Sequence, residues 1–495
     1  MKKYLLAIDQ GTTSTRTILF STTGKKINQV NYEIKQYYPH PGWVEHDPME
    51  IYSKTLATIL EVVALSNVSF LDIAAIGITN QRETIVVWDK ETAKPVYNAI
   101  VWQSTQSKET LDKYEKYKEI IKKKTGLLMN PYFSASKIRW LFDTYPYLQK
   151  QAEEGKIMCG TIDSWLLYKL TNGKVHATDY SNASRTLLFN IHTLTWDDEL
   201  LSIFNIPKGI LPEVKDSSGI FGYIDSSILP SSIPISGIAG DQQAALFGHY
   251  CFDEGTLKNT YGTGCFSLMN TGKQIVDSKN GLLSTIAWKI KDDVCYALEG
   301  SVFIGGAAIQ WLRDELCLIK DAKDSERYAK KEPSSQGVYV VPSFTGLGTP
   351  YWDENCKGAI FGLTRGTNKY ILVKATLESI AYQSMDVIET MKKETGFDIL
   401  ELSVDGGATN NNYLMQFQAD ILNCKVVLHD TDQTTALGAA YLAGLGVGLY
   451  KNINEIKENK CHKTIYYPSM NRKTITELRK GWKNAIKATR MFKGK

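Results

Sequence analysis

The stretch AIDQGTTSTR, residues 7–16, decides the fold. An apolar run at residues 4–8 ends in Asp9, and a glycine with a row of hydroxyl residues separates it from a second apolar run at residues 17–20. Two short strands around a Gly/Thr turn predict a β-hairpin. The N–H groups and hydroxyls of such a turn can hold phosphate oxygens, with the closing arginine as a fixed positive charge. A plain hairpin in which Gly11 serves the turn explains the same residues equally well, and the chain has no GxxxxGK[ST] loop.

A second Gly/Thr hairpin opens the second half of the chain. Strands are expected at residues 256–260 and 265–269, on either side of the turn YGTG at residues 261–264. Strands alternate with helices in both halves, which indicates an α/β fold. The recurring hairpin indicates an internal duplication that divides the chain into a domain of residues 1–250 and a domain of residues 251–495. No flexible linker separates these halves, so we expect them to be closely packed.

Hydrophobic periodicity predicts further elements in both halves. Strands are expected at residues 73–79, 84–88, 157–162, 233–239 and 402–408, and helices at residues 48–66, 105–125, 164–170, 244–249 and 472–495. The Lys/Glu-rich helix at 105–125 should be solvated. The last helix is basic and carries an apolar stripe of Ile475, Leu478, Trp482, Ile486 and Met491. A membrane-surface or nucleic-acid helix is one interpretation, but packing of the stripe on the protein body is the favoured one.

Composition narrows the class of protein. Among 495 residues, 57 Lys and Arg against 53 Asp and Glu give a net charge of +4, which does not favour a nucleic-acid partner. The chain has no apolar run of about 18 residues and its opening apolar run is too short for a signal peptide, so we expect no membrane insertion and a cytoplasmic location. The eight cysteines are scattered, which predicts buried free thiols. The seven histidines lack ligand spacing, so no structural transition-metal site is expected.

Three polar sites near the ends of predicted strands each have two interpretations. Asp241, where a strand meets a helix, is either a helix N-cap or a general base at the carboxyl end of a sheet. Arg82 and Glu83 are either a surface ion pair or a pair that binds hydroxyl groups, since arginine offers only donors and glutamate only acceptors. The stretch GGATNNN at residues 406–412 either lets a ligand approach the backbone or forms a crowded turn.

Taken together, these stretches resemble a family of carbohydrate kinases over residues 4 to about 445. The matching stretches are AIDQGTTSTR (7–16), ITNQRET (78–84), NAIVWQ (98–103), NPYFSASKIRWL (130–141), GTIDSWLLYKLT (160–171), ISGIAGDQQAALFG (235–248), NTYGTGCF (259–266), VPSFTGLGTPYWD (341–353) and VDGGATNNNYLMQFQAD (404–420). Several are weak singly, but the set is specific. The QRET stretch at 81–84 is similar to that of members that act on glycerol, and sugar kinases of the family generally lack it.

The resemblance implies two ribonuclease-H-like domains, as in actin-like ATPases, that flank a deep cleft. Polyol would bind to residues 1–250 and ATP mainly to residues 251–495. The implied reaction transfers the γ-phosphoryl group of ATP to a terminal hydroxyl of glycerol, giving sn-glycerol 3-phosphate and ADP. Members are commonly homodimers or homotetramers. A kinase for another polyol or sugar, and an actin-like ATPase that controls a protein partner, remain alternatives.

The resemblance also assigns residues. Asp241 matches the catalytic base. The positions that match the glycerol site are Arg82, Glu83, Trp102, Tyr132, Asp241, Gln242 and Phe266, of which Trp102 and Phe266 form an apolar wall. The positions that match the ATP site are Thr12, Thr13, Ser14, Arg16 and Thr263 at the phosphates and Gly306, Gln310, Gly407 and Asn411 at the adenosine. Asp9 and Asp241 would hold Mg²⁺, through waters, because Mg²⁺ keeps much of its hydration shell.

Overall fold

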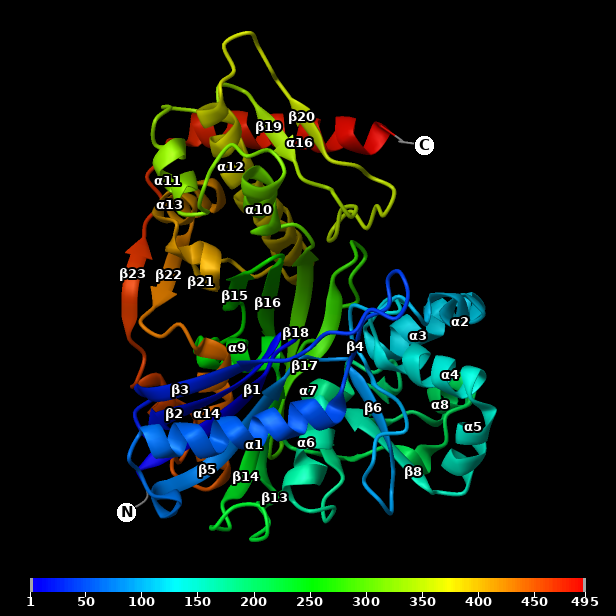
Figure 1. Ribbon diagram of the computed structural model, residues 1–495. Coiled ribbons are helices and arrows are strands. Elements are labelled where there is room, and N and C mark those ends of the chain that lie inside the picture. The colour runs from blue at the N-terminus through cyan, green and yellow to red at the C-terminus, as the bar shows by residue number, and fades with distance from the viewer. Residues whose placement is uncertain (1–2, 493–495) are drawn as a thin grey trace.

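Two large β-sheets, one from each half of the chain, organise the protein in a computed structural model that describes residues 3–492 (Figure 1). The first sheet, in the lower part of Figure 1, has the order β13 (Ser218–Tyr223), β14 (Pro234–Gly240), β5 (Ile73–Asn80), β1 (Tyr4–Gln10), β2 (Ser14–Ser21) and β3 (Lys26–Glu33). The second has the order β17 (Leu283–Ile290), β18 (Asp293–Val302), β16 (Cys265–Gly272), β15 (Leu257–Tyr261), β21 (Glu401–Asp405), β22 (Lys425–His429) and β23 (His462–Tyr466).

The two sheets repeat one strand arrangement. In the first, β1 and β2 form an antiparallel hairpin that β3 extends, and β5 and β14 follow in parallel on the other side of β1. In the second, β15 and β16 form the hairpin, β18 extends it, and β21 and β22 follow in parallel. Both predicted Gly/Thr hairpins are therefore confirmed, as is the repetition of one strand arrangement in the two halves.

Strands β1 and β5 are buried because both faces of the first sheet are covered. α1 (Pro48–Leu65) lies on one face, and its Ile51 and Ile59 share a core with Leu6 and Ile8 of β1. The opposite face is covered by α14 (Thr434–Gly446), which comes from the second half of the chain. Central parallel strands covered in this way become continuous apolar runs, which is the pattern that made them recognisable in the sequence.

Helix α14 lies unusually close to the face of the first sheet that it covers, and Figure 1 shows it at that sheet. A Cβ atom added at Gly77 of β5 would lie 2.2 Å from the carbonyl oxygen of Ala439, and one added at Gly438 would lie 1.8 Å from that of Ala244 in α9 (Asp241–Gly248). Glycine thus permits backbone-to-backbone contact at these crossings. A segment from residues 251–495 consequently completes the core of residues 1–250.

Shorter elements surround the two sheets. A four-stranded sheet has the order β4 (Glu45–His46), β7 (Ala99–Ile100), β6 (Ile85–Asp89) and β8 (Ile157–Thr161). Short strand pairs join β9 (Ala177–Asp179) with β12 (Glu213–Lys215), β10 (Phe189–Asn190) with β11 (Thr195–Trp196), and β19 (Tyr339–Val341) with β20 (Ala359–Phe361). Other helices are α4 (Ser134–Thr144), α5 (Pro146–Glu153), α6 (Ile162–Leu170), α7 (Tyr180–Ala183), α8 (Asp198–Phe204), α10 (Ala307–Asp314), α11 (Asp324–Ala329), α12 (Lys369–Thr395), α13 (Asn412–Leu422) and α15 (Ile453–Lys457).

The prediction of one solvated helix at residues 105–125 is wrong. The segment forms α2 (Lys108–Asp112), a 3₁₀ turn and α3 (Lys118–Thr125). Leu111 and Ile121 are buried in one apolar cluster, against which Tyr114 and Tyr117 also pack. The segment is divided into short helices because all four side chains pack on that cluster. The high charge of the sequence gave no sign of this division.

The last helix, α16 (Arg472–Met491), packs on the second half of the molecule, as the favoured interpretation predicted. Ile475, Trp482 and Ile486 are buried, and the Trp482 indole N–H donates to Asp386 at 2.6 Å. Met491 departs from the predicted stripe because its side chain is 74% exposed. The predicted helix extended to residue 495, and residues 493–495 lie outside the described part.

Two further sequence expectations concern cysteines and membranes. Cys159, Cys251, Cys265, Cys356 and Cys424 are buried free thiols, but Cys317 and Cys461 are exposed, so the prediction of buried thiols is wrong for those two. None of the helices within residues 3–492 combines the length and the apolar character that a membrane crossing requires.

Candidate active site

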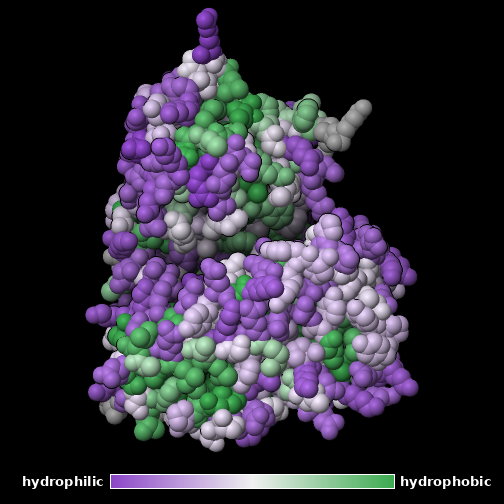
Figure 2. All heavy atoms as spheres, in the orientation of Figure 1, coloured by the Kyte–Doolittle hydropathy of each residue, from purple (hydrophilic) through white to green (hydrophobic). Residues whose placement is uncertain are grey.

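The carboxyl ends of three parallel strands bring acidic and basic side chains to one edge of the first sheet. Asp9 near the end of β1 and Ala239 near the end of β14 both pair with Thr79 of β5, so the three strands end at one level. Arg82 and Glu83 follow β5, and Asp241 follows β14 at the start of α9. This edge is where α/β proteins bind ligands. Figure 2 shows a crevice between the two parts of the molecule.

Asp241 is held by backbone and charge contacts while remaining accessible. Gly240 is the N-cap of α9, so the interpretation of Asp241 as the cap is wrong. One carboxylate oxygen accepts from the Gln242 N–H at 2.7 Å and lies 3.3 Å from Nε of Arg82, and the side chain is 32% exposed. Enclosure by protein raises the pKa of Asp241, with Arg82 and Lys258 opposing and the charge of Asp9 adding to the rise.

Arg82 and Glu83 are not a surface pair, because both are buried within a four-member charge network. The Arg82 guanidinium donates to both carboxylate oxygens of Glu299, at 2.5 and 3.2 Å. Arg185 donates to Glu83 at 2.6 Å and to Glu299 at 2.8 Å. The two arginines and two glutamates balance in charge, as buried ions require.

The sequence analysis missed Arg185 and Glu299. Arg185 lies just after α7, and Glu299 is the lone charged residue in the buried stretch of β18, a strand of the second sheet. A single acid inside an apolar strand was the available signal, since such a charge needs a buried partner. Nothing local identified that partner, because Glu299 and Arg82 are 217 positions apart in the chain.

Contacts join the other candidate polyol-binding residues to this network. The Tyr132 hydroxyl lies 3.5 Å from the Arg82 guanidinium, and its ring makes an edge contact with Trp102 at a centroid distance of 5.3 Å. The Trp102 indole N–H donates to the Thr12 hydroxyl at 2.9 Å. An indole and a phenol ring beside fixed polar groups suit a small polyol, which offers both hydroxyls and a carbon face.

Lys258 of β15 is a third residue that the sequence analysis missed. Its side chain is buried, donates to the Gln242 side-chain oxygen, and donates to the Phe266 carbonyl at 3.3 Å. Two candidate residues from opposite halves, Gln242 and Phe266, are thereby tied together. Burial lowers the pKa of Lys258, while Asp405 and Asp241 favour its charged form.

The arginine of the first Gly/Thr hairpin is held by an acidic partner. Arg16 forms an ion pair with Asp9 at 2.8 Å, and its side chain is 35% exposed. The two residues lie directly opposite each other in the β1–β2 register, which explains the pairing. The hydroxyl-bearing turn of Thr12, Thr13 and Ser14 lies between them, and Gly11 N–H closes it on the Ser14 carbonyl at 3.0 Å.

The second Gly/Thr hairpin meets the loop before α10. The Thr263 carbonyl accepts from the Gly305 N–H at 2.8 Å, and the Gly306 N–H donates to the Gly262 carbonyl at 2.9 Å. Gly406 approaches the same hairpin with a φ of +94°, and a Cβ atom there would lie 2.5 Å from the Tyr261 carbonyl oxygen. The structure thus gathers three glycine-bearing loops, as a nucleotide site needs.

The candidate adenosine residues differ in their surroundings, and Asn411 has a structural role of its own. Asn411 caps α13 by accepting from the Leu414 N–H at 3.0 Å, and its amide group donates to Ser325 at 3.2 Å. Gln310 is an exposed residue of α10, and Gly407 is exposed beside Gly406. Within the described chain, no hydrogen bond or ion pair links Gln310 or Asn411 to the phosphate-side residues.

Asp9 and Asp241 were the candidate Mg²⁺ ligands. Mg²⁺ usually takes one or two carboxylates and completes its shell with waters and phosphates, so these two carboxylates fit the ion by chemistry. The charge of Asp9 raises the pKa of Asp241, and a cation near both would relieve that repulsion. Within residues 3–492, no three His, Cys, Asp or Glu side chains gather as a metal cluster.

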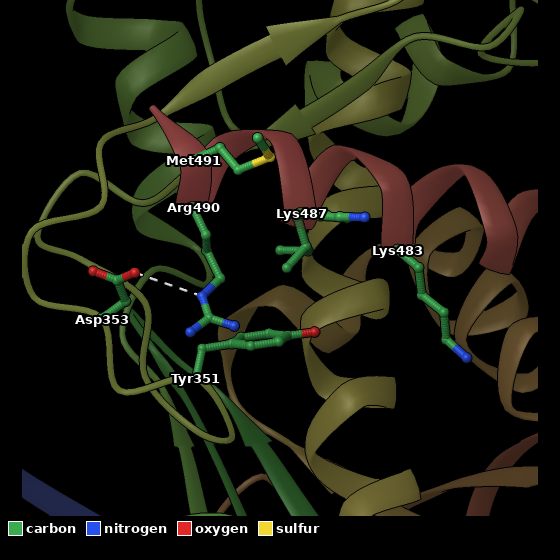
Figure 3. A pocket seen from close by; sticks show the side chains of 7 residues that line it. Tyr351, Asp353, Lys483, Lys487, Arg490 and Met491 are labelled. Atoms are coloured by element: carbon green, nitrogen blue, oxygen red, sulfur yellow. Dashed lines mark hydrogen bonds and ion pairs between the residues drawn. The ribbon is translucent and has the colours of Figure 1, made fainter. Parts of the chain in front are cut away.

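A separate pocket lies beneath α16 (Figure 3). Its volume is about 420 Å³, and it is lined by Tyr351, Asp353, Lys483, Ile486, Lys487, Arg490 and Met491. Arg490 points toward Tyr351 and pairs with Asp353 at 3.5 Å. It contains none of the candidate site residues.

The duplicated sheet, its two Gly/Thr hairpins and the aspartate at the sheet edge place the protein in the actin-like fold class. Both parts of the chain match the FGGY family of carbohydrate kinases. Residues 4–248 match the family's N-terminal domain, and residues 257–447 match its C-terminal domain. The chain therefore belongs to the FGGY family of carbohydrate kinases, whose two ribonuclease-H-like domains account for the observed fold.

Individual proteins agree. A glycerol kinase of Bacillus cereus is 55% identical over 496 residues, which cover 100% of both chains. The crystal structure of Plasmodium falciparum glycerol kinase with ADP superposes with a TM-score of 0.94 at 37% identity, covering 98% of both chains. Gluconate kinase from Lactobacillus acidophilus gives a TM-score of 0.90 at 25% identity, covering 99% of both chains.

Proposed function

We propose that this protein is an ATP:glycerol 3-phosphotransferase, which converts glycerol and ATP to sn-glycerol 3-phosphate and ADP. The observation that carries the proposal is the placement of Asp241 beside Arg82, with a one-third exposed carboxylate at the edge of the first sheet. Relatives named glycerol kinase at 55% identity over the full chain support glycerol as the acceptor.

In this proposal Arg82, Glu83, Tyr132 and Gln242 hold the three hydroxyls of glycerol. Trp102 and Phe266 contact its carbon atoms. Asp241 accepts the proton of the attacking terminal hydroxyl as the bond to the γ-phosphorus forms and the bond to the leaving oxygen of ADP breaks. Phosphoryl transfer depends mainly on positioning and on neutralising charge, so fixed donors around one base suit it.

The nucleotide is proposed to lie across the two Gly/Thr hairpins. Thr12, Thr13, Ser14, Arg16 and Thr263 would hold its phosphates, and Gly306, Gln310, Gly407 and Asn411 its adenosine. Asp9 and Asp241 would hold Mg²⁺, which supplies positive charge beside the phosphates when it is bound. Residues 1–250 would thus bind polyol and residues 251–495 mainly ATP. A cytoplasmic location, where ATP is abundant, and a homodimer or homotetramer complete the proposal.

The deciding experiment measures ADP release by the purified protein with glycerol, with a pentulose and with no acceptor. We expect turnover with glycerol and little without an acceptor. Turnover only with the pentulose would indicate a kinase for another acceptor. Rapid turnover without any acceptor would indicate a partner-controlled ATPase.

Replacing Arg82 with alanine should weaken glycerol binding. We expect the KM for glycerol to rise by roughly ten- to a hundredfold, because charge-assisted hydrogen bonds of this size are lost, while the KM for ATP stays within about threefold. Steady-state kinetics with each substrate varied in turn measures both constants. Arg139→Ala is the control, because Arg139 is also buried but bonds to Asp143 and Gln149 away from the site. An unchanged KM for glycerol in Arg82→Ala contradicts the role.

The pH dependence of kcat/KM should show an acidic limb that belongs to Asp241. The base acts only when deprotonated, and burial raises its pKa above that of an ordinary aspartate. Activity is therefore full above the raised pKa and falls as the pH decreases through it. A pH–rate profile, taken where circular dichroism shows an intact fold, tests this. A profile that stays flat down to the ordinary aspartate range contradicts it.

A further inference from the structure

Glu299 lies in the second sheet but contacts the polyol-side arginine of the first half. It is 1% exposed, and β18 carries it to the point where Arg82 and Arg185 meet. Burial alone would raise its pKa, but Arg185 and Arg82 lower it to about 2, which favours the carboxylate form that both arginines contact.

The contacts of Arg82 are divided between two sides. The paired terminal nitrogens face Glu299, at 2.5 and 3.2 Å, which is the bidentate geometry that fixes a guanidinium plane. Nε lies 3.3 Å from Asp241 and 3.8 Å from Glu83, and it has no hydrogen-bond partner in the structure. The terminal nitrogens also contact Gln243 at 3.3 Å and Tyr132 at 3.5 Å, but the bond to Glu299 at 2.5 Å is the shortest contact of the guanidinium. Glu299 therefore holds the guanidinium with its Nε toward the base.

Arg185 is a second arginine that holds Glu299 in place. It is fully buried, donates to Glu299 at 2.8 Å and to Glu83 at 2.6 Å, and its guanidinium lies over the ring of Phe133 at 5.3 Å. The carboxylate therefore cannot turn away from Arg82 without breaking a second charged bond. A buried network with its members paired orients each of them more strictly than one pair does.

We infer that Glu299 is a positioning residue for glycerol: a carboxylate of the second half that sets the orientation of Arg82 in the polyol site of the first half. This inference rests on the proposed function, because it assigns Arg82 to the hydroxyls of glycerol. Acceptor recognition is then built jointly by both halves of the chain. Glu299 itself acts through Arg82.

The test is a double-mutant cycle of Glu299→Gln, Arg82→Met and the combined variant. We expect Glu299→Gln to lower kcat/KM for glycerol about a hundredfold, mainly through KM, because displacing a positioning group by about 1 Å has effects of that size. The KM for ATP should stay within about threefold. The combined variant should be no worse than Arg82→Met within about threefold, since the two residues act as one unit.

Two outcomes overturn the inference: an unchanged KM for glycerol in Glu299→Gln, or a combined loss equal to the product of the single losses. Asp386→Asn is the control, since Asp386 is also a buried carboxylate of the second half but bonds to Trp482 and Tyr351. If Glu299→Gln does not fold, the charge-balanced variant E299Q/R185Q gives the same KM test with Arg82 retained.

Turnover measurements on the wild-type protein distinguish a failure of this inference from a failure of the proposed function. If wild type turns over a different acceptor, the proposed substrate is wrong, and the cycle is run with that acceptor. An unaltered KM for it in Glu299→Gln then overturns the positioning role, and a raised KM with a non-additive cycle supports it.

Discussion

Replacing Asp241 with asparagine should lower kcat for glycerol phosphorylation by about a hundredfold or more, the usual contribution of a general base. The amide keeps the size and one acceptor of the carboxylate, so the contact with the Gln242 N–H at 2.7 Å can persist. It cannot accept the proton of the attacking hydroxyl. The KM for glycerol should therefore change little, within about threefold, because Arg82 and its neighbours still hold the substrate.

Asp163→Asn is the matched control for this variant. Asp163 is a fully buried aspartate of the same half and bonds to the hydroxyls of Thr161 and Thr178 at 2.5 and 2.6 Å. Its replacement should leave kcat near the wild-type value. Normal turnover by Asp241→Asn, or an equal loss in Asp163→Asn, would refute the assignment of Asp241 as the base.

Replacing Gly438 with alanine should destabilise the protein by about 3 kcal/mol or more, although alanine favours helices. The added Cβ would lie 1.8 Å from the carbonyl oxygen of Ala244 and 2.9 Å from the amide nitrogen of Gly248. Both contacts are with backbone, which cannot rotate away as a side chain can. Helices α14 and α9 must move apart, and α9 carries Asp241 at its first residue.

Urea denaturation measures this effect as a fall in the midpoint. Gly209→Ala is the control, because a Cβ at that position meets no atom within 4 Å. We also expect the folded fraction of Gly438→Ala to lose activity, since the base moves with α9. A midpoint at or above that of wild type would show that the contact between the two helices is not tight.

Much of the fold was predictable because its signals are local. The two hairpins appear in the sequence as short strand-like segments around Gly/Thr turns, and each lies within about twenty residues. The ion pair of Asp9 with Arg16 could also have been predicted, since a tight hairpin places those positions opposite each other. The sequence analysis predicted the hairpin but not its register, so it did not identify Asp9 as the partner of Arg16.

The partners of the candidate site residues could not be predicted from local sequence patterns. Arg82 meets Glu299 across 217 positions and Arg185 meets Glu83 across 102, and such contacts exist only once the two sheets are assembled. Lys258 sits in a strand of mostly polar sequence, LKNTY, in which a lysine gave no reason to expect burial. The broken helix at 105–125 failed for a related reason, because tertiary packing of Leu111 and Ile121 overrides local helical preference.

The late position of α14 in the chain has a consequence for folding during synthesis. The last of the three strands, β14, ends at Gly240, so β1, β5 and β14 all leave the ribosome well before Thr434–Gly446 is synthesised. Until then the face of the sheet that carries Leu5 and Ala7 lacks its helical cover. The nascent chain thus presents an apolar surface suited to chaperone capture, and a fragment ending near residue 250 would retain it and aggregate.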